Sequence, residues 1–154
     1  MHSDHYVWFI WASAFLIPWA ILYAALPGHR RMMLWTSIFT MPMGLTEPIF
    51  VPKYWNPPSL FDLAQRTGFD IESLIFCFAI AGIGSVFYSA LTGRSLTPVD
   101  SAERRRPLHA LHYLALALPF IIFVPLYFVP WNPIIPAIAA MLLGAGATIL
   151  CRPI

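Results

Sequence analysis

The chain has 154 residues, of which 59% are hydrophobic and 10% are charged, and its formal net charge is +2. With a mean hydropathy of +0.70, it has too little polar surface for a water-soluble globular protein of this size. The apolar stretches lack the alternating pattern of a membrane barrel, so helices remain as the structure that satisfies the backbone in lipid. We therefore expect an all-α integral membrane bundle that forms a single domain over residues 1–154.

Apolar stretches of membrane-spanning length predict about five transmembrane helices. Each stretch is near the roughly 17–25 residues that a helix needs to cross the hydrocarbon core. The stretches cover residues 7–26, 32–51, 71–91, 108–129 and 134–150. In the last of them Ala140, Gly144 and Thr148 are four residues apart, which predicts close approach to a neighbouring helix. We expect residues 108–154 to form an additional helical hairpin.

The basic residues predict the orientation of these helices. If every stretch spans the membrane, one face receives six basic residues and the other receives three. The six are Arg30, Arg31, Arg94, Arg104, Arg105 and Arg106, and the three are Lys53, Arg66 and Arg152. We therefore expect an integral protein of a prokaryotic inner membrane with its N-terminus outside. The run at residues 104–106 is interpreted as a topology signal and not as a nucleic-acid site.

The connection at residues 52–70 mixes prolines with aromatic and polar residues, and this topology places it on the outer face. Aromatic rings favour the headgroup level, so we expect this loop to lie on the membrane interface, where it could act as a lid. The sequence Trp-Asn-Pro at residues 55–57 recurs at residues 131–133. The recurrence indicates either an internal repeat two helices apart or the ordinary preference of Trp and Pro for helix ends.

Two glutamates occur where the chain is otherwise most apolar. Glu47 is near the end of the second stretch and Glu72 is at the start of the third, so both carboxyls should lie at similar depth and face one cavity. Burial would keep one of them protonated at neutral pH, and a neutral carboxylic acid is a proton donor. The alternative for Glu47, which ends a polar stripe running from Thr36 through Gly44, is an interhelical hydrogen bond. For Asp70 we prefer the role of a helix cap.

The motifs between residues 30 and 91 resemble those of a known family. They are Arg30-Arg31, Leu34-Trp35, Glu47, Trp55-Asn56-Pro57, Gly68, Glu72 and Phe76. Together they resemble the lycopene cyclase domain, the small membrane-embedded type of heterodimeric bacterial and of archaeal and fungal lycopene cyclases. The chain departs from the family pattern at three positions. Asp70 replaces a proline, Ser73 replaces a second glutamate, and Glu47 replaces the usual aspartate.

The resemblance implies redox-neutral cyclisation of a linear carotenoid by an intramolecular lyase or isomerase. An acid protonates the terminal double bond, the cation closes to a six-membered ring, and loss of a proton gives the ionone end group. Glu72 and Glu47 are then the expected acid and base. Expected substrate contacts are Trp35, Phe50, Trp55, Asn56 and Phe76, whose aromatic members could stabilise a cation. No cofactor and no metal are expected, and the expected partners are a lipid-soluble carotenoid and a homologous or second membrane subunit.

Other functional classes fit the sequence less well. The Gly-Ile-Gly segment at residues 82–84 is only part of a dinucleotide fingerprint, and there is no Asp-rich cluster for magnesium and a diphosphate. His109 and His112 could ligate a metal or a pigment, but two interfacial histidines are more often solvated. The remaining alternative is a non-catalytic carotenoid-binding or scaffold subunit of a larger membrane complex. Ser73 favours that alternative, whereas the two retained glutamates favour an enzyme.

Overall fold

The computed structural model describes residues 6–97, 100–105, 107 and 111–151 of the chain. These residues form helices, turns and loops, and none of them lies in a strand, which confirms the all-helical fold class. The chain divides into two compact units, Met1–Leu96 and Thr97–Ile154, which are called unit 1 and unit 2.

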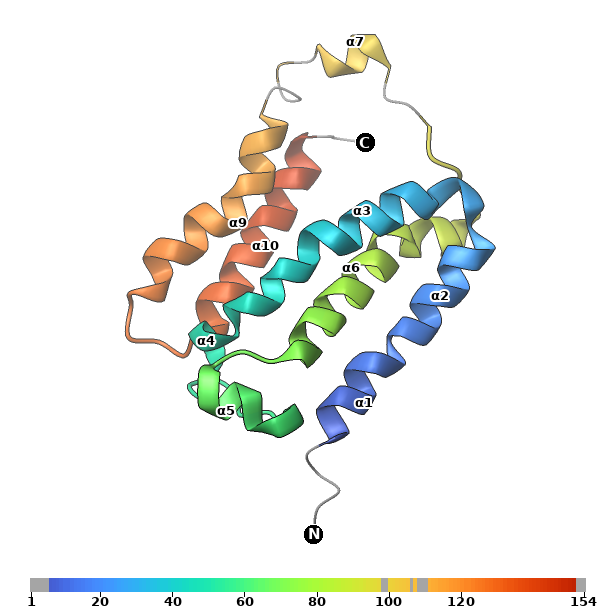
Figure 1. Cartoon of the computed structure of the whole chain (residues 1–154). Coiled ribbons are helices and arrows are strands. Elements are labelled where there is room, and N and C mark those ends of the chain that lie inside the picture. The colour runs from blue at the N-terminus through green and yellow to red at the C-terminus, as the bar shows by residue number, and fades with distance from the viewer. Residues whose placement is uncertain (1–5, 98–99, 106, 108–110, 152–154) are drawn as a thin grey trace. The chain divides into compact units, whose positions relative to one another are not determined.

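Unit 1 is built from the helices α1 (Val7–Ala14), α2 (Leu16–Ala25), η2 (Pro27–His29), α3 (Arg30–Thr40) and α6 (Ile71–Thr92). Of these, α1 and α2 run in one direction, α3 runs in the opposite direction, and α6 runs again in the first (Figure 1). The consecutive helices α1 and α2 pack against one side of α6, and α3 returns along another side (Figure 1). The turn at η2 and the last turn of α6 therefore lie at one end of unit 1, and the first turns of α1 and α6 lie at the other.

The helices of unit 1 approach one another closely at Gly82 of α6. An added Cβ atom at Gly82 would lie 2.3 Å from both Ser37 Oγ and Trp19 Nε1. These two side chains are joined by a hydrogen bond of 2.9 Å that the Trp19 indole donates to Ser37. A residue without a side chain is needed where α6 passes this close to α2 and α3.

Two helical stretches of the described residues are long and apolar enough to cross a membrane. They are Val7–Ala25, which combines α1 and α2, and Ile71–Thr92, which is α6. Both agree with the bounds predicted from the sequence. Shorter apolar helices cover His112–Tyr127 and Ile134–Leu150.

The second apolar stretch does not form one regular α-helix, which corrects the expected single helix over residues 32–51. After α3 the chain continues as the 3-10 helix η3 (Met41–Thr46) and the one-turn helix α4 (Glu47–Phe50). Pro42 and Pro48 explain the change, because proline has no N–H for the α-helical ladder and its ring clashes with the preceding turn. Glu47 therefore begins a new helical turn instead of lying late in a long helix.

The loop before α6 is folded and lies at the end of unit 1 where α6 begins (Figure 1). It contains η4 (Leu60–Asp62) and α5 (Leu63–Thr67). Gly68 ends α5 in the left-handed conformation, with φ of 78°, which favours glycine. Asp70 then caps α6 by accepting a hydrogen bond of 2.5 Å from the amide of Ser73, and the predicted cap is confirmed.

Unit 2 contains the predicted helical hairpin. The elements formed by its described residues are α7 (Ser101–Arg104), α9 (His112–Tyr127) and α10 (Ile134–Cys151). Helices α9 and α10 pack along each other, and Gly144 is a point of close contact, because an added Cβ would lie 2.4 Å from Pro119 Cγ. The small-residue face predicted for the last stretch is thus occupied by α9 at Gly144, and Ala140 of the same face is buried.

The two Trp-Asn-Pro segments differ in local structure. The side chain of Asn132 accepts a hydrogen bond of 3.1 Å from the amide of Ile134, at the start of α10. Asn56 instead accepts a hydrogen bond of 3.3 Å from the side chain of Gln65 within the folded loop. The recurrence in sequence therefore does not mark equivalent local structures.

Candidate active site

A cavity of about 200 Å³ lies at the end of unit 1 where α6 begins. Four parts of the fold contribute to it, namely α1, the η3 and α4 segment, the loop, and the first turns of α6. The lining residues are Trp8, Met43, Gly44, Thr46, Glu47, Phe50, Trp55, Ser73, Phe76 and Cys77. The wall is thus mainly aromatic and apolar, with a single carboxylate among the lining residues.

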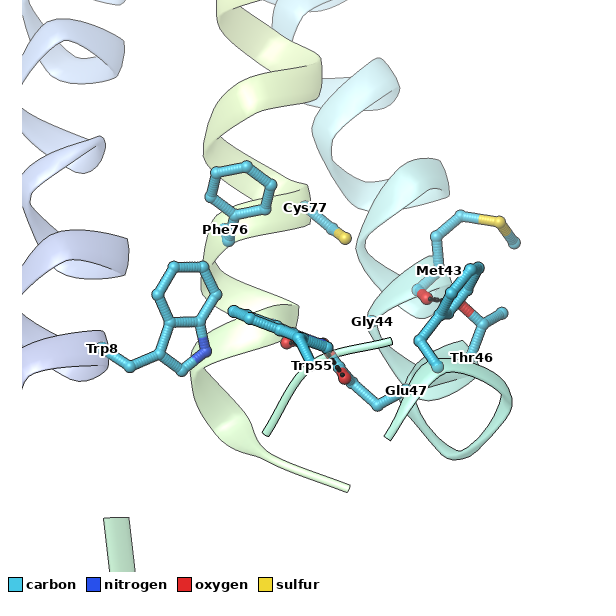
Figure 2. Close-up of a pocket in the computed structure, with 10 residues that line it drawn as sticks. Trp8, Met43, Gly44, Thr46, Glu47, Trp55, Phe76 and Cys77 are labelled. Carbon is cyan, nitrogen blue, oxygen red and sulfur yellow. Dashed lines mark hydrogen bonds between the residues drawn. The ribbon is translucent and has the colours of Figure 1, made fainter. Parts of the chain in front are cut away.

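Glu47 is the carboxylate of this cavity, and only 8% of its surface is exposed. Its Oε2 accepts a hydrogen bond of 3.1 Å from the indole Nε1 of Trp55. Its Oε1 accepts a short hydrogen bond from the hydroxyl of Ser73 on α6. Figure 2 shows the carboxyl group directed from α4 toward Trp55. Both oxygens are therefore held by protein groups, one from the loop and one from the neighbouring helix.

The position of Glu47 follows from the tight packing of η3 against α6. An added Cβ atom at Gly44 would lie 2.7 Å from the amide nitrogen of Leu74 and from the carbonyl carbon of Ser73. Glycine is therefore required for the two backbones to touch at this point. Because Glu47 follows Gly44 by three residues, it lies on the same helical face and meets Ser73. The interhelical hydrogen bond that the sequence offered as the alternative for Glu47 is therefore present in the structure.

Three aromatic rings surround the space beside Glu47. The ring of Trp8 meets that of Trp55 edge to face, with centroids 5.0 Å apart and an interplanar angle of 87°. Trp8 also contacts Phe76, with centroids 5.6 Å apart. Figure 2 shows Trp55 between Trp8 on α1 and Glu47 on α4, with Phe76 above them on α6. Such faces attract a positive charge that forms between them.

Glu72 is also buried, but it does not line this cavity, which corrects the expectation that both carboxyls share it. Its Oε1 accepts a hydrogen bond of 2.6 Å from the amide of Leu60 in the loop. The difference has a geometric cause, because one residue along a helix turns the side chain by about 100°. Ser73 faces Glu47, so Glu72 faces the folded loop, and its carboxyl holds that loop to α6.

The other predicted substrate contacts separate into two groups. Trp55 and Phe76 line the cavity, as does Phe50. Trp35 does not, since it is 49% exposed on α3 and stacks on Phe39 with centroids 5.4 Å apart. Asn56 is exposed and bonds within the loop, so it also lies outside the lining.

Several cavity residues were not predicted from the sequence as site residues. They are Trp8, Met43, Gly44, Thr46, Ser73 and Cys77. Ser73 carried a signal, because the sequence motif that this segment resembles has a glutamate at this position. Trp8 carried only a weak signal, because it is one of several aromatic residues and lies near the start of the first predicted span. Its indole Nε1 is buried without a hydrogen-bond partner.

Metal ligands do not gather in the described part of the chain. Among these residues no group of three or more His, Cys, Asp or Glu side chains could hold a metal ion. His109 lies outside the described residues, and His112 begins α9 in unit 2.

Comparison of the chain with protein-family models, with curated proteins and with solved structures gives no match. The site must therefore be interpreted from its own geometry.

Proposed function

We propose that the chain is a membrane-embedded cyclase of linear carotenoids, or one subunit of such an enzyme, in which Glu47 is the acid. The observation that carries the proposal is the buried carboxyl of Glu47 in the wall of an aromatic cavity. Acid-initiated cyclisation needs a proton donor, an apolar enclosure and aromatic faces near the cation. The resemblance of residues 30–91 to the lycopene cyclase domain supports the choice of substrate.

The proposed reaction is balanced without a cofactor. Neutral Glu47 transfers its proton to a carbon of the terminal double bond, whose electron pair forms the new C–H bond. The next double bond attacks the resulting cation and closes a six-membered ring. The ring cation then loses a proton from a neighbouring carbon to the Glu47 carboxylate, and a new double bond forms. The substrate keeps its composition, and Glu47 is returned to its neutral form.

The size of the cavity supports binding of one end group. An engineered apolar protein cavity of roughly 150 Å³ binds benzene, so a volume of about 200 Å³ is suitable for one six-membered ring with small substituents. A linear carotenoid is far longer than such a group. Met43 lines the cavity and is 39% exposed, so we place the exit for the remaining polyene beside this residue, toward lipid or a second subunit.

The membrane arrangement belongs to the same proposal. We assign five spans in a prokaryotic inner membrane with the N-terminus outside, supported by the two long apolar helices and by the six-to-three asymmetry of basic residues. Reporter fusions after Gly28 and after Gly93 test this, since Gly28 is in η2 and Gly93 follows the last turn of α6, at the arginine-rich end of unit 1. Both fusions should report the cytoplasm, and a periplasmic signal from either one contradicts the topology.

The catalytic part is tested by replacing the proposed acid. Glu47→Gln keeps the shape and still accepts a hydrogen bond from Trp55, but it has no proton to transfer. Lycopene conversion is measured in membranes that hold equal amounts of each protein, together with any required partner subunit. We expect a loss of roughly 10²–10⁴-fold, the usual contribution of a general acid. Asp100→Asn is the matched control, because it makes the same chemical change at an exposed residue outside the cavity lining and should convert lycopene normally.

Full activity of Glu47→Gln contradicts the enzyme proposal. The chain would then be assigned as a non-catalytic carotenoid-binding or scaffold subunit, in which the same cavity holds a pigment end group without reacting with it.

A further inference from the structure

The two hydrogen-bond partners of Glu47 differ in what they can do. The indole Nε1 of Trp55 is a donor only, so Oε2 of Glu47 accepts its hydrogen bond whether the carboxyl is neutral or ionised. The hydroxyl of Ser73 both donates and accepts. Trp55 cannot accept a proton from Oε2, whereas Ser73 Oγ can accept one from Oε1, so we assign the proton of neutral Glu47 to Oε1 and take Oε2 as the carbonyl oxygen. That proton points to a hydroxyl that can accept it in a hydrogen bond.

We propose that Ser73 is a positioning residue that keeps the transferable proton of Glu47 on Oε1 and then stabilises the carboxylate that remains. This inference rests on the proposed function of Glu47. Before the transfer, Oε1–H donates to Ser73 Oγ. For the transfer, the Oε1–H bond turns from Ser73 Oγ to the substrate carbon and breaks as the C–H bond forms. The hydroxyl of Ser73 then rotates and donates to the Oε1 carboxylate oxygen. Ser73 exchanges no proton with the substrate, and its hydrogen bond with Glu47 reverses in direction.

Backbone contacts hold Ser73 in position, while its O–H bond remains able to rotate. Its amide donates to Asp70 Oδ1 over 2.5 Å, and Gly44 packs directly on its carbonyl carbon. Only 3% of the surface of Ser73 is exposed. The residue is in the first turn of α6, where the helix dipole favours a nearby negative charge. A hydroxyl held at this position can therefore stabilise the Glu47 carboxylate with little rearrangement.

The contact between Ser73 and Glu47 gives a physical meaning to the serine at this position. The motif that this segment resembles has a second glutamate there. A glutamate at this position would place two carboxyls in contact. The serine instead gives Glu47 a neutral partner, so a single acidic proton belongs to the pair.

The test compares Ser73→Ala with Ser73→Thr in membranes that contain the full chain and any required partner. Ser73→Ala should lower kcat roughly 10- to 100-fold, as expected for loss of a hydrogen bond to a charged group, and should leave KM unchanged. The infrared carbonyl stretching band of neutral Glu47, identified by its absence in Glu47→Gln, should shift to higher frequency. Ser73→Thr keeps the hydroxyl and should restore both kcat and the band position.

The matched control is Ser85→Ala on the same helix, whose hydroxyl donates to the carbonyl of Gly82 and does not line the cavity. It should change neither kcat nor the band. Wild-type kcat and an unshifted band in Ser73→Ala would overturn the inference, as would failure of Ser73→Thr to restore either quantity. If Glu47→Gln is inactive while Ser73→Ala is normal, only this inference fails. If Glu47→Gln is fully active, the proposed function fails as well.

Discussion

Glu47 and Glu72 lie near the same end of unit 1, and both are buried, with 8% and 0% of their surfaces exposed. Their surroundings nevertheless differ. The carboxyl of Glu47 lies in the wall of an aromatic cavity and is held by two side chains, those of Trp55 and Ser73. The carboxyl of Glu72 accepts a hydrogen bond from the backbone of Leu60 and lies outside the cavity lining.

This difference teaches that burial alone does not assign a chemical role to a carboxyl group. A catalytic acid needs space beside it for the reacting group. Glu47 lines the cavity that offers this space, and Glu72 does not. A carboxyl that holds a loop amide contributes to the position of the loop. Because the loop carries Trp55, Glu72 supports the site through the position of that tryptophan.

Among the variants that distinguish the surroundings of Glu47 from those of Glu72, the largest loss of activity is expected from a change at Gly44. In Gly44→Ala the new Cβ would lie 2.7 Å from the backbone of α6, so η3 must move away and take Glu47 with it. A displacement of about 1 Å can cost roughly 10²-fold in rate, and overpacking costs about 1–3 kcal/mol in stability. Lycopene conversion and thermal unfolding in detergent measure the two effects. Gly84→Ala, which has no neighbour within 4 Å, should behave as wild type, and equal losses in both variants would contradict the role of Gly44.

A smaller loss of kcat should distinguish an aromatic residue that lines the cavity from one that does not. Trp8→Leu removes a ring that contacts both Trp55 and Phe76, and a cation–π contribution of about 0.5–2 kcal/mol corresponds to a loss of roughly 2- to 30-fold in kcat. Trp35→Leu removes a ring that stacks on Phe39, on a surface away from the cavity lining, and should leave kcat unchanged. The kcat values of both variants are measured at saturating lycopene. If the Trp35 variant loses more activity than the Trp8 variant, the cation is not stabilised in this cavity.

The smallest effect on turnover is expected at Glu72. In Glu72→Gln the amide oxygen can still accept from Leu60, so kcat should fall less than about 10-fold. Glu72→Leu removes the acceptor and leaves the buried amide of Leu60 without its partner, which should cost about 1–3 kcal/mol in unfolding free energy. Thermal unfolding and lycopene conversion of the two variants give both quantities. A loss of roughly 10²–10⁴-fold in Glu72→Gln would instead identify Glu72 as the acid.

Much of the fold could be predicted from the sequence, because continuous apolar runs of fixed length report on helices directly. The bounds of α6 and of the combined α1 and α2 agree with the predicted stretches, and the cap at Asp70 follows from its residue type. The break after α3 was missed because the hydropathy of residues 32–51 does not record that Pro42 and Pro48 interrupt the hydrogen-bond ladder.

The site could be predicted only in part. The rarity of carboxyls in apolar segments identified Glu47, and the motif identified Trp55 and Phe76. The separation of Glu47 from Glu72 depends on the rotation of α6 relative to α4, which a single sequence does not encode in any local pattern. The inclusion of Trp8 depends on long-range packing of α1 beside α6. Contacts of this kind become visible only when the helices are assembled.

The most direct test of the central claim is chemical rescue of truncated carboxyls in membranes supplied with lycopene. Glu47→Ala removes the acid and leaves space beside the cavity for a small carboxylic acid. Added propionic acid should restore cyclisation by Glu47→Ala in proportion to its concentration, whereas propionamide, which has the same shape but no acidic proton, should not. Glu72→Ala should respond to neither compound. Rescue of Glu72→Ala by propionic acid, without rescue of Glu47→Ala, would contradict the assignment of Glu47 as the proton donor.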